Sequence, residues 1–425
     1  MEEAFLHFIW KYQQFIHNSM RTVDGLDISV FEPGYTNTDA GPDFKNAKIR
    51  IGEITWNGHV EIHVRASDWR RHNHQHDPAY ENVVLHVVWD ADEIVHRKDG
   101  TSIPALELNK LVDEKLLLRY RQLLIPESDI LCQNHLAAIS VLTKYSMMDN
   151  ALARRLEAKA NMIFRDIALT NHDWEEIAWR SLARNFGFKT NSATFRDLAK
   201  SLPLKILKKE ADKVPVVEAL LFGQAGFLDD GSADDYQEAL KLEYAFKARK
   251  YGLEKKLGRH QWKFLRLRPA NFPTVRIAQL AGLVSRQPNI FSLFVDHNSP
   301  RRLIKHLATE QSDYWLRHYD FGKKAKAKIG QLGRNSIENI LVNTVAPLLF
   351  AYGIHKDNDE LKEKATGLLG ALKAENNSII AKWRAAGFEV KSAFDSQALI
   401  EQFNEYCQKK QCLKCQIGAD IIRLA

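Results

Sequence analysis

One short stretch decides how the N-terminal part of this chain folds: AGPDFKNAKIRIGEITWNGHVEIHV, residues 40–64. Its apolar and β-branched residues alternate with polar ones in short runs, and Gly-containing dipeptides separate the runs. Such alternation is typical of half-buried strands joined by turns. The stretch also contains a Pro-Asp pair and a Glu-Ile-His triplet. It therefore forms either ordinary sheet or a sheet that contributes two halves of a metal site.

The surrounding sequence extends this pattern into an α+β domain. Residues 1–20 carry apolar side chains at helical spacing, among them Phe5, Phe8 and Ile9, and this spacing predicts an amphipathic helix. About five strand-like runs follow between residues 26 and 108, and nearly every later segment has a helical pattern. We therefore expect an α+β domain at residues 1–125, with one helix and a mixed sheet of about five strands. A large all-helical region is expected at 126–425.

The composition is typical of a soluble globular protein. The 425 residues are 45% hydrophobic and too many for one ordinary domain. The N-terminus mixes Glu and His with apolar residues, and no later run approaches about 18 apolar residues. The sequence thus predicts no membrane segment and a cytoplasmic location. A net charge of +7 permits binding to DNA or RNA without requiring it, and the oligomeric state stays open.

Glu61 and His63 are two positions apart, and alternate residues of a strand share one face of the sheet. Whether Asp43 reaches that face depends on where the chain reverses. A three-residue turn at 52–54 would set Asp43 opposite His63 and diagonal to Glu61, at about 7–8 Å between α-carbons. One divalent cation can bridge two carboxylates at that separation.

The dipeptide Asn57-Gly58 favours a second register, because it is a strong signal for a two-residue hairpin turn. With the turn at that position, Asp43 does not lie opposite Glu61. The metal site would then require the strand before it to lie on another edge. The sequence leaves both registers open.

The order of these elements resembles the PD-(D/E)xK nuclease superfamily: a helix, a strand, Pro42-Asp43 at the head of the next strand, and Glu61-Ile62-His63 on the following one. The resemblance implies a restriction-endonuclease-like fold with Asp43 and Glu61 as ligands of Mg²⁺ or Mn²⁺. His63 would stand where the family has the Lys that positions the attacking water, and Glu3 would add an accessory carboxylate. A neutral imidazole supplies no fixed positive charge, but it can act as a base or a ligand.

A loop rich in His and Asp follows these strands, SDWRRHNHQHDP at residues 67–78. Imidazole suits Zn²⁺ or Mn²⁺ better than it suits Mg²⁺. An exposed polar loop without a metal is the alternative interpretation. The candidate accessory residues of this loop are Asp68, His72, His74 and His76.

The pattern as a whole is similar to a family of bacterial proteins known only as a domain of unknown function. The segments that carry this likeness include FLHFIWKYQ, AGPDFKNAKI, VEIHVRASDW and RLRPANFPTVRIAQLA. It extends over nearly the whole chain and implies no activity. Function must therefore be argued from the residues.

The cysteines form a second candidate metal site. They are too few and too clustered for a secreted disulfide scaffold. Four thiolates suit Zn²⁺ or a [4Fe–4S] cluster, and C-x-x-C is a ligand-like spacing, whereas isolated buried thiols are the alternative. One shared site requires the first cysteine to lie near the other three. The four are Cys132, Cys407, Cys412 and Cys415.

Arginines alternate with aromatic residues in WKFLRLRPANFPTVR, residues 262–276. Phosphate contact and base stacking would use this combination, so Arg266, Arg268 and Arg276 are candidate residues for binding DNA or RNA. The prolines exclude a continuous helix through this segment. The alternative is a corner fixed by proline and held by buried arginine ion pairs.

Three hypotheses for function follow. The first is a metal-dependent, nuclease-like hydrolase acting on nucleic acid. The second is a catalytically inactive nucleic-acid-binding or interaction protein that keeps the fold, and the third is a metal-dependent hydrolase of another substrate that uses the His-rich loop. The sequence has neither a Gly-rich phosphate loop nor a G-x-S-x-G elbow, so it gives no support to nucleotide-loop or serine-hydrolase chemistry.

Overall fold

The computed structural model of the chain describes residues 1–423 apart from residues 38, 126–127, 230, 232, 255–256 and 298. The chain forms two compact units. Unit 1 contains residues 1–149, 381–388 and 401–425, and unit 2 contains residues 150–380 and 389–400. The C-terminal segment thus belongs to the N-terminal unit, whereas the sequence pattern grouped it with the helical region. The boundary expected at residue 126 lies outside the described residues.

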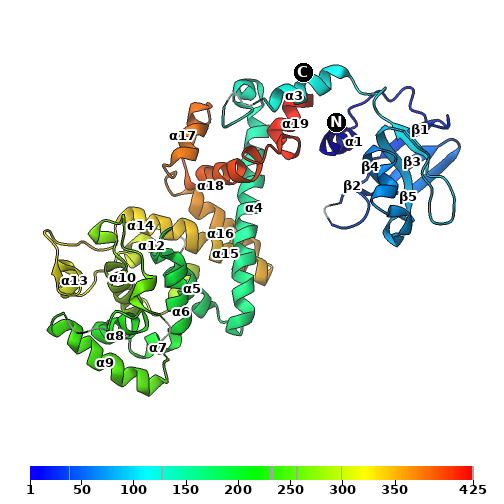
Figure 1. Cartoon of the computed structure of the whole chain (residues 1–425). Helices are drawn as coiled ribbons and strands as arrows, with labels where there is room; N and C mark the ends of the chain where they lie inside the picture. The colour runs from blue at the N-terminus through cyan, green and yellow to red at the C-terminus, as the bar shows by residue number, and fades with distance from the viewer. Residues whose placement is uncertain are drawn as a thin grey trace. The chain divides into compact units, whose positions relative to one another are not determined.

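Unit 1 contains a mixed sheet preceded by a helix (Figure 1). The strand order is β1-β3-β4-β5-β6, and the short β2 pairs with β3. β3 is antiparallel to β1 and β4, whereas β4, β5 and β6 are parallel to one another. The predicted α+β class is confirmed, with one helix, a sheet of about this size and a large helical region after it. The strands are β1 Ile28–Glu32, β2 Tyr35–Thr36, β3 Phe44–Ile51, β4 Ile54–Arg65, β5 Val83–Asp90 and β6 Ala105–Glu107.

Helix α1 (Glu3–Tyr12) packs against β4 through its apolar face. Phe5, Leu6 and Ile9 are fully buried, and they follow the helical spacing seen in the sequence. The helix ends where Gln13 adopts a left-handed conformation with φ of 52°. β5 is buried along most of its length, as expected for a strand with parallel neighbours on both sides. Together, α1 and the sheet form the core of unit 1.

The chain reverses between β3 and β4 at Gly52 and Glu53, so that Ile51 pairs with Ile54. Neither predicted register is correct, because the turn lies at the first of the two positions but contains two residues instead of three. Gly52 has φ of +59°, which glycine adopts without steric cost.

Gly58, the second predicted turn residue, lies inside β4. A Cβ at this position would lie 2.4 Å from Cγ1 of Val84 and 2.7 Å from the carbonyl oxygen of Asn82. The glycine therefore permits the close approach of the neighbouring chain segment and forms no turn.

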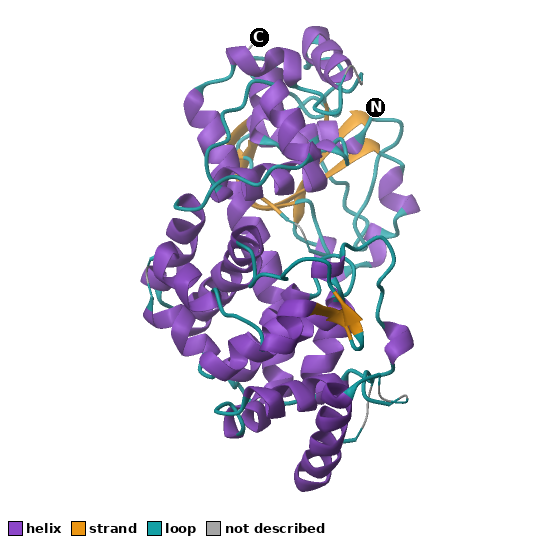
Figure 2. Cartoon of the chain, turned by 90° about the vertical axis from the view of Figure 1, so that its left-hand side faces the viewer, coloured by secondary structure: helices purple, strands orange, loops and turns teal. Residues whose placement is uncertain are grey.

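Helices account for most of the remaining structure (Figure 2). The helices within unit 1 are α1, α2 Asp68–Arg71, η1 His74–His76, η2 Pro78–Tyr80, α3 Glu114–Leu123, η3 Gln133–Ala138, η8 Phe403–Cys407, η9 Cys412–Lys414 and α19 Gln416–Arg423. Those that run across a unit boundary are α4 Val141–Ile167, α17 Ser378–Ala385 and α18 Ala393–Gln402.

In its described residues, unit 2 is built of helices and one small two-stranded sheet. Its elements are η4 Ala168–Thr170, α5 Trp174–Phe186, α6 Ser192–Ser201, α7 Leu204–Lys209, α8 Val214–Gln224, α9 Asp235–Tyr251, η5 Arg259–Gln261, η6 Pro269–Asn271, α10 Pro273–Arg286, α11 Ile290–Asp296, α12 Pro300–Leu307, α13 Asp313–Arg317, β7 His318–Asp320, β8 Lys323–Lys324, α14 Arg334–Ile340, η7 Leu341–Val345, α15 Ala346–Lys356 and α16 Asp359–Gly370.

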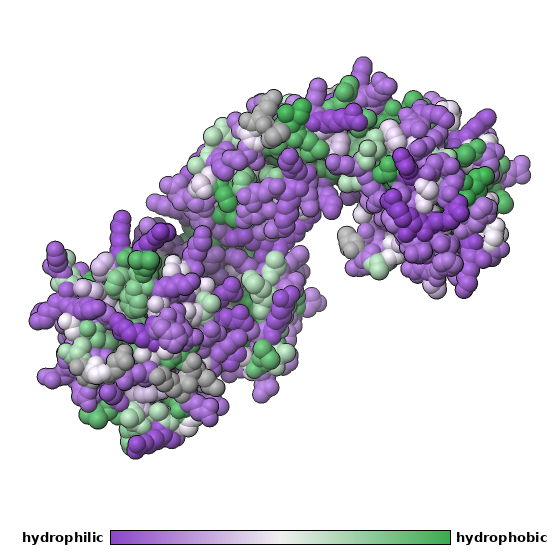
Figure 3. All heavy atoms as spheres, viewed as in Figure 1, coloured by the Kyte–Doolittle hydropathy of each residue, from purple (hydrophilic) through white to green (hydrophobic). Residues whose placement is uncertain are grey.

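Among the described residues, one helical stretch, Arg334–Lys356, is long and apolar enough to cross a membrane by length and composition. About two thirds of its most apolar window is buried inside the structure, as in the core helix of a soluble protein. The face of the molecule drawn in Figure 3 is largely hydrophilic, with apolar side chains scattered among polar ones.

Candidate metal centre

A bulge in β3 brings Asp43 to the face of the sheet that carries Glu61. Between Phe44 and Ala47, β3 contains one residue more than the matching part of β4. Asn46 lies in this bulge with φ of 59°, a left-handed conformation that asparagine adopts more readily than most residues. A shift of one residue moves a side chain to the opposite face of a sheet. The bulge therefore decides which side of the sheet Asp43 faces.

Asp43 and Glu61 hold each other in place through the backbone. The N–H of Asp43 donates to Oε2 of Glu61 at 3.1 Å, and the N–H of Ile62 donates to Oδ2 of Asp43 at 3.0 Å. Glu61 is only 5% exposed. Both carboxylates are thus fixed in orientation, and each keeps a second oxygen for other partners.

His63 lies on the same face of β4 as Glu61 and is buried. Its Nε2 atom lies 3.5 Å from Oε1 of Glu61, and its Nδ1 atom lies 2.9 Å from Nε2 of His86 on β5. If Nε2 of His63 binds a metal, Nδ1 carries the hydrogen and donates it to His86, and this bond fixes the orientation of the ring.

The His-rich loop adds two imidazoles to the same point. Nδ1 of His72 lies 3.2 Å from Nε2 of His63, and Nε2 of His74 lies 3.3 Å from Oε1 of Glu61. One ligand atom from each of these three histidines fits within a group no wider than 4.8 Å. His63 is buried, His74 is half-buried and His72 is exposed, so the group opens toward solvent. His74 also stacks on Tyr80 at 3.8 Å between ring centroids, and this contact holds the loop over the sheet.

Helix α1 contributes one further imidazole. Nε2 of His7 lies 3.3 Å from Oδ2 of Asp43 and 3.8 Å from Oε1 of Glu3. Its Nε2 atom is buried and has no hydrogen bond of good geometry. His7 therefore lies at the edge of the centre, beside Asp43.

Burial sets the charge of these groups. Burial, followed by the neighbouring imidazoles, lowers the pKa of His63 to about 2, and burial lowers the pKa of His86 to about 3. Burial raises the pKa of Glu61. Burial would lower the pKa of His7, but the contact with Asp43 outweighs it and the pKa is raised. Neutral imidazoles keep the nitrogen lone pairs that bind metals.

This donor set has a definite chemical preference. Three imidazoles and a carboxylate within a few ångströms suit Zn²⁺ or Mn²⁺, whereas Mg²⁺ prefers oxygen ligands and water. A bound cation would also offset the cost of burying the Glu61 carboxylate.

A comparison with known protein families identifies the family of this chain. The model of the family described as "Protein of unknown function (DUF2851)" matches residues 3–378. The chain belongs to this family. No curated protein and no solved structure shows significant similarity to it. The matched residues of the DUF2851 chain include all the residues of the metal centre, whereas Cys407, Cys412 and Cys415 lie beyond them.

The remaining accessory residues of the DUF2851 chain have different positions. Asp68 is buried, pairs with Arg71 at 2.9 Å and accepts from the N–H of Arg65 at 3.3 Å, so it holds the start of the loop. His76 is exposed and lies outside the histidine group. Sequence reasoning missed His7 as a member of the centre. The signal was its position one helical turn after Glu3 on α1.

The three candidate nucleic-acid residues of the DUF2851 chain lie in unit 2. Arg266 and Arg268 are exposed. Arg276 is buried on α10 and donates to Oε1 of Gln279 at 3.0 Å and to Oδ1 of Asn271 at 2.6 Å. Burial lowers its pKa to about 10. Arg276 therefore holds the corner between η6 and α10, with only 7% of its surface exposed.

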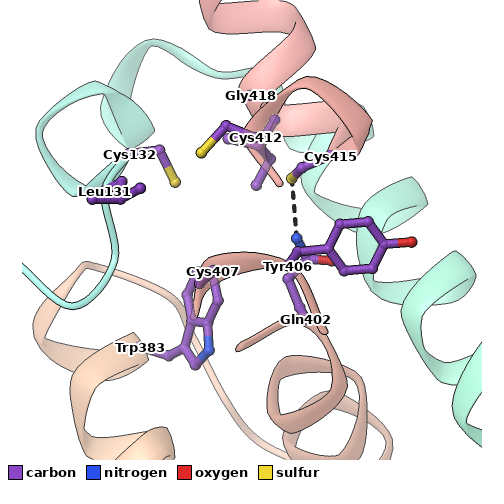
Figure 4. A pocket seen from close by; sticks show the side chains of 10 residues that line it. Leu131, Cys132, Trp383, Gln402, Tyr406, Cys407, Cys412, Cys415 and Gly418 are labelled. Carbon is purple, nitrogen blue, oxygen red and sulfur yellow. Dashed lines mark hydrogen bonds between the residues drawn. The ribbon is translucent and has the colours of Figure 1, made fainter. Parts of the chain in front are cut away.

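The four cysteines of the DUF2851 chain line one pocket in unit 1 (Figure 4). Cys132 comes from the turn before η3, and the other three come from the C-terminal segment. Sequence spacing identified the C-terminal group, but only the fold brings Cys132 to it.

Proposed function

We propose that this protein is a metal-dependent phosphodiesterase of the nuclease type, with Glu61 and a group of histidines as its metal ligands. The observation that carries the proposal is the proximity of Glu61, His63 and Asp43 on one face of the sheet, with His72 and His74 beside them. Carboxylates and neutral imidazoles at such distances hold divalent metals in hydrolases.

The residues of the chain would share the work in the following way. Glu61, His63 and His74 would hold the cation, and Asp43 would orient Glu61 through its backbone N–H. A divalent cation in such a site polarises a phosphodiester and lowers the pKa of a bound water. His72 is exposed at the mouth of the group and in contact with His63, so it is placed to exchange protons with solvent.

His63 bears on the choice of metal. The family that the motif resembles has a lysine at this position, which carries a positive charge. A buried neutral imidazole cannot provide that charge, so neutralisation of the substrate phosphate would depend on the cation. The proposed cofactor is therefore Mn²⁺ or Zn²⁺, and Mg²⁺ would support less activity.

The test is metal content and nuclease activity of the same preparations. Wild-type protein should bind Mn²⁺ or Zn²⁺ and cleave labelled DNA or RNA, and chelation should abolish cleavage. Glu61→Gln should lose metal and activity together. The matched control is Glu53→Gln, which makes the same chemical change at the exposed turn between β3 and β4 and should behave as the wild type.

Two other outcomes would replace the proposal. Salt-dependent binding of DNA or RNA that persists without cleavage in wild type and in Glu61→Gln would indicate an inactive nucleic-acid-binding protein. Metal-dependent hydrolysis of a non-nucleic ester, with no cleavage of DNA or RNA, would indicate a hydrolase with another substrate.

A further inference from the structure

The four cysteine side chains converge although three different parts of the chain carry them. Cys132 precedes η3 and Cys407 ends the π-helical segment η8. Cys412 is the first residue of η9, and Cys415 follows its last residue. All four line the same pocket, and Figure 4 shows the sulfur atoms of Cys132, Cys412 and Cys415 around it. None of the four forms a disulfide. Four thiols brought to one point by the fold are the usual protein ligand set for Zn²⁺ or an iron–sulfur cluster.

The spacing of the sulfurs is too wide for one zinc ion. Zinc–sulfur bonds of about 2.3 Å place tetrahedral sulfurs within about 4 Å of one another. Among the described residues, the histidine group is the one set of three or more ligands within 4.8 Å, so no three of these sulfurs meet that limit. A four-iron cube separates its thiolates more widely than a single ion does.

The surroundings of the pocket suit a cluster. Its lining includes the apolar side chains of Leu131, Trp383 and Ile417. Nε2 of Gln402 donates to Sγ of Cys415 at 3.0 Å, and Gln402 is itself buried. An apolar shell and hydrogen bonds to thiolate sulfur are the features by which proteins stabilise and tune iron–sulfur clusters.

The backbone is built closely around the C-terminal cysteines. A Cβ on Gly418 would lie 2.2 Å from the carbonyl oxygen of Cys412, so only glycine lets α19 begin against this turn. Lys410 adopts a left-handed φ of 52°, which reverses the chain between Cys407 and Cys412. Both features fix the three C-terminal cysteines relative to one another.

We propose that the four cysteines, Cys132, Cys407, Cys412 and Cys415, bind a [4Fe–4S] cluster that fastens the C-terminal segment to unit 1. The cluster is structural and separate from the histidine centre. It ties Cys132 to the C-terminal segment, and such a cross-link stabilises the fold by restricting the unfolded chain. Helix α1 packs against both η9 and β4, so loss of the cluster would also loosen the helix that carries His7.

The experiment is anaerobic purification of the full chain from iron-supplemented cells, followed by analysis of iron, acid-labile sulfide and zinc. The expected result is about four iron and four sulfide per chain, with a broad visible absorption that bleaches on reduction. One zinc per chain without iron would overturn the proposal. So would a folded protein that holds neither metal after reconstitution with iron and sulfide.

Two variants separate the cluster from general folding defects. Cys412→Ser should lose iron and lower the melting temperature. Gln402→Leu should keep the iron content but shift the reduction potential of the cluster, because it removes the hydrogen bond to Cys415. If Gln402→Leu left the reduction potential and the spectrum of the cluster unchanged, the assignment of Cys415 as a cluster ligand would be contradicted. Binding of Mn²⁺ at the histidine centre is measured separately. It tests the proposed phosphodiesterase function whether or not the cysteines bind a cluster.

Discussion

The backbone N–H of Asp43, directly before β3, donates to Oε2 of Glu61 on β4 at 3.1 Å. The return bond runs from the N–H of Ile62 to Oδ2 of Asp43. These two bonds join the Pro-Asp turn to the strand that carries the Glu-Ile-His triplet. They exist because the bulge in β3 brings Asp43 into line with Glu61.

Asp43→Ala tests whether the alignment of Asp43 with Glu61 supports metal binding. The substitution removes the carboxylate that accepts from the N–H of Ile62. We expect the variant to fold, as judged by circular dichroism, and to bind Mn²⁺ about 10-fold more weakly than the wild type. Deletion of Asn46 is the control and should keep near-wild-type affinity, because the pairing becomes regular while Asp43 stays opposite Glu61. Wild-type affinity in Asp43→Ala would show that Asp43 is not needed.

His74 and His76 form a matched pair, because both lie in η1 and only His74 belongs to the metal group. His74→Ala should lower the affinity for Zn²⁺ or Mn²⁺ by about 100-fold or more, since it removes a ligand. His76→Ala should have no effect. Titration calorimetry of chelator-treated protein measures both, and equal losses would place the metal elsewhere in the loop.

The buried histidines predict a loss of stability in acid. The folded-state pKa values of about 2 for His63 and about 3 for His86 lie below the unfolded value of ~6.5. The unfolded chain therefore binds more protons below pH 6.5. Each histidine costs about 1.4 kcal/mol per pH unit as the pH falls from 6.5 toward 3. The raised pKa of Glu61 acts in the opposite direction and offsets part of this loss.

Urea unfolding of the chelator-treated protein at pH 7.5 and 5.5 measures this effect. We expect unfolding free energy to fall by up to about 3 kcal/mol, and by roughly half as much in His86→Gln. Added Zn²⁺ should raise the unfolding free energy at both pH values without flattening the dependence, because the protons are taken up by the unfolded chain. If the unfolding free energy changed equally with pH in the wild type and in His86→Gln, His86 would be excluded as a source of the acid sensitivity.

Gly58→Ala should destabilise unit 1, because the new methyl group would meet Val84 and the backbone of Asn82. Overpacking of this kind costs about 1–3 kcal/mol. Gly367→Ala in α16 is the control, since nothing lies within 4 Å of its added Cβ. Alanine is the better helix former by up to about 1 kcal/mol, so this variant should be slightly more stable. Thermal unfolding of both variants measures these two changes in stability.

Arg266 and Arg268 are exposed, and they predict phosphate contacts in unit 2. The double variant Arg266→Ala/Arg268→Ala should weaken DNA or RNA binding and lower the salt dependence of log K by about 2. Arg301→Ala/Arg302→Ala removes the same charge from another exposed site on α12 and should change affinity less. Fluorescence anisotropy at several salt concentrations compares the two, and an equal effect would indicate attraction by net charge alone.

The sequence predicted the elements better than their pairing. The apolar spacing around Phe5 predicted α1, and alternation around Glu61 predicted β4, because these patterns depend on local geometry. The turn signal at Asn57-Gly58 was misleading. That glycine serves a close contact with β5, and the sequence alone does not reveal such a contact.

In the candidate site, too, the sequence predicted the residues better than their spatial arrangement. Asp43, Glu61 and His63 were recognisable as residue types in a motif, and so were the four cysteines. The sequence by itself determined the α+β class and these two groups of candidate metal ligands, because alternation, helical spacing and residue chemistry are properties of short segments. Tertiary structure alone decided that His74 meets Glu61, that His7 meets Asp43, and that Cys132 shares a pocket with Cys412. A one-residue bulge and the packing of distant segments set those distances, and neither leaves a local pattern in the sequence.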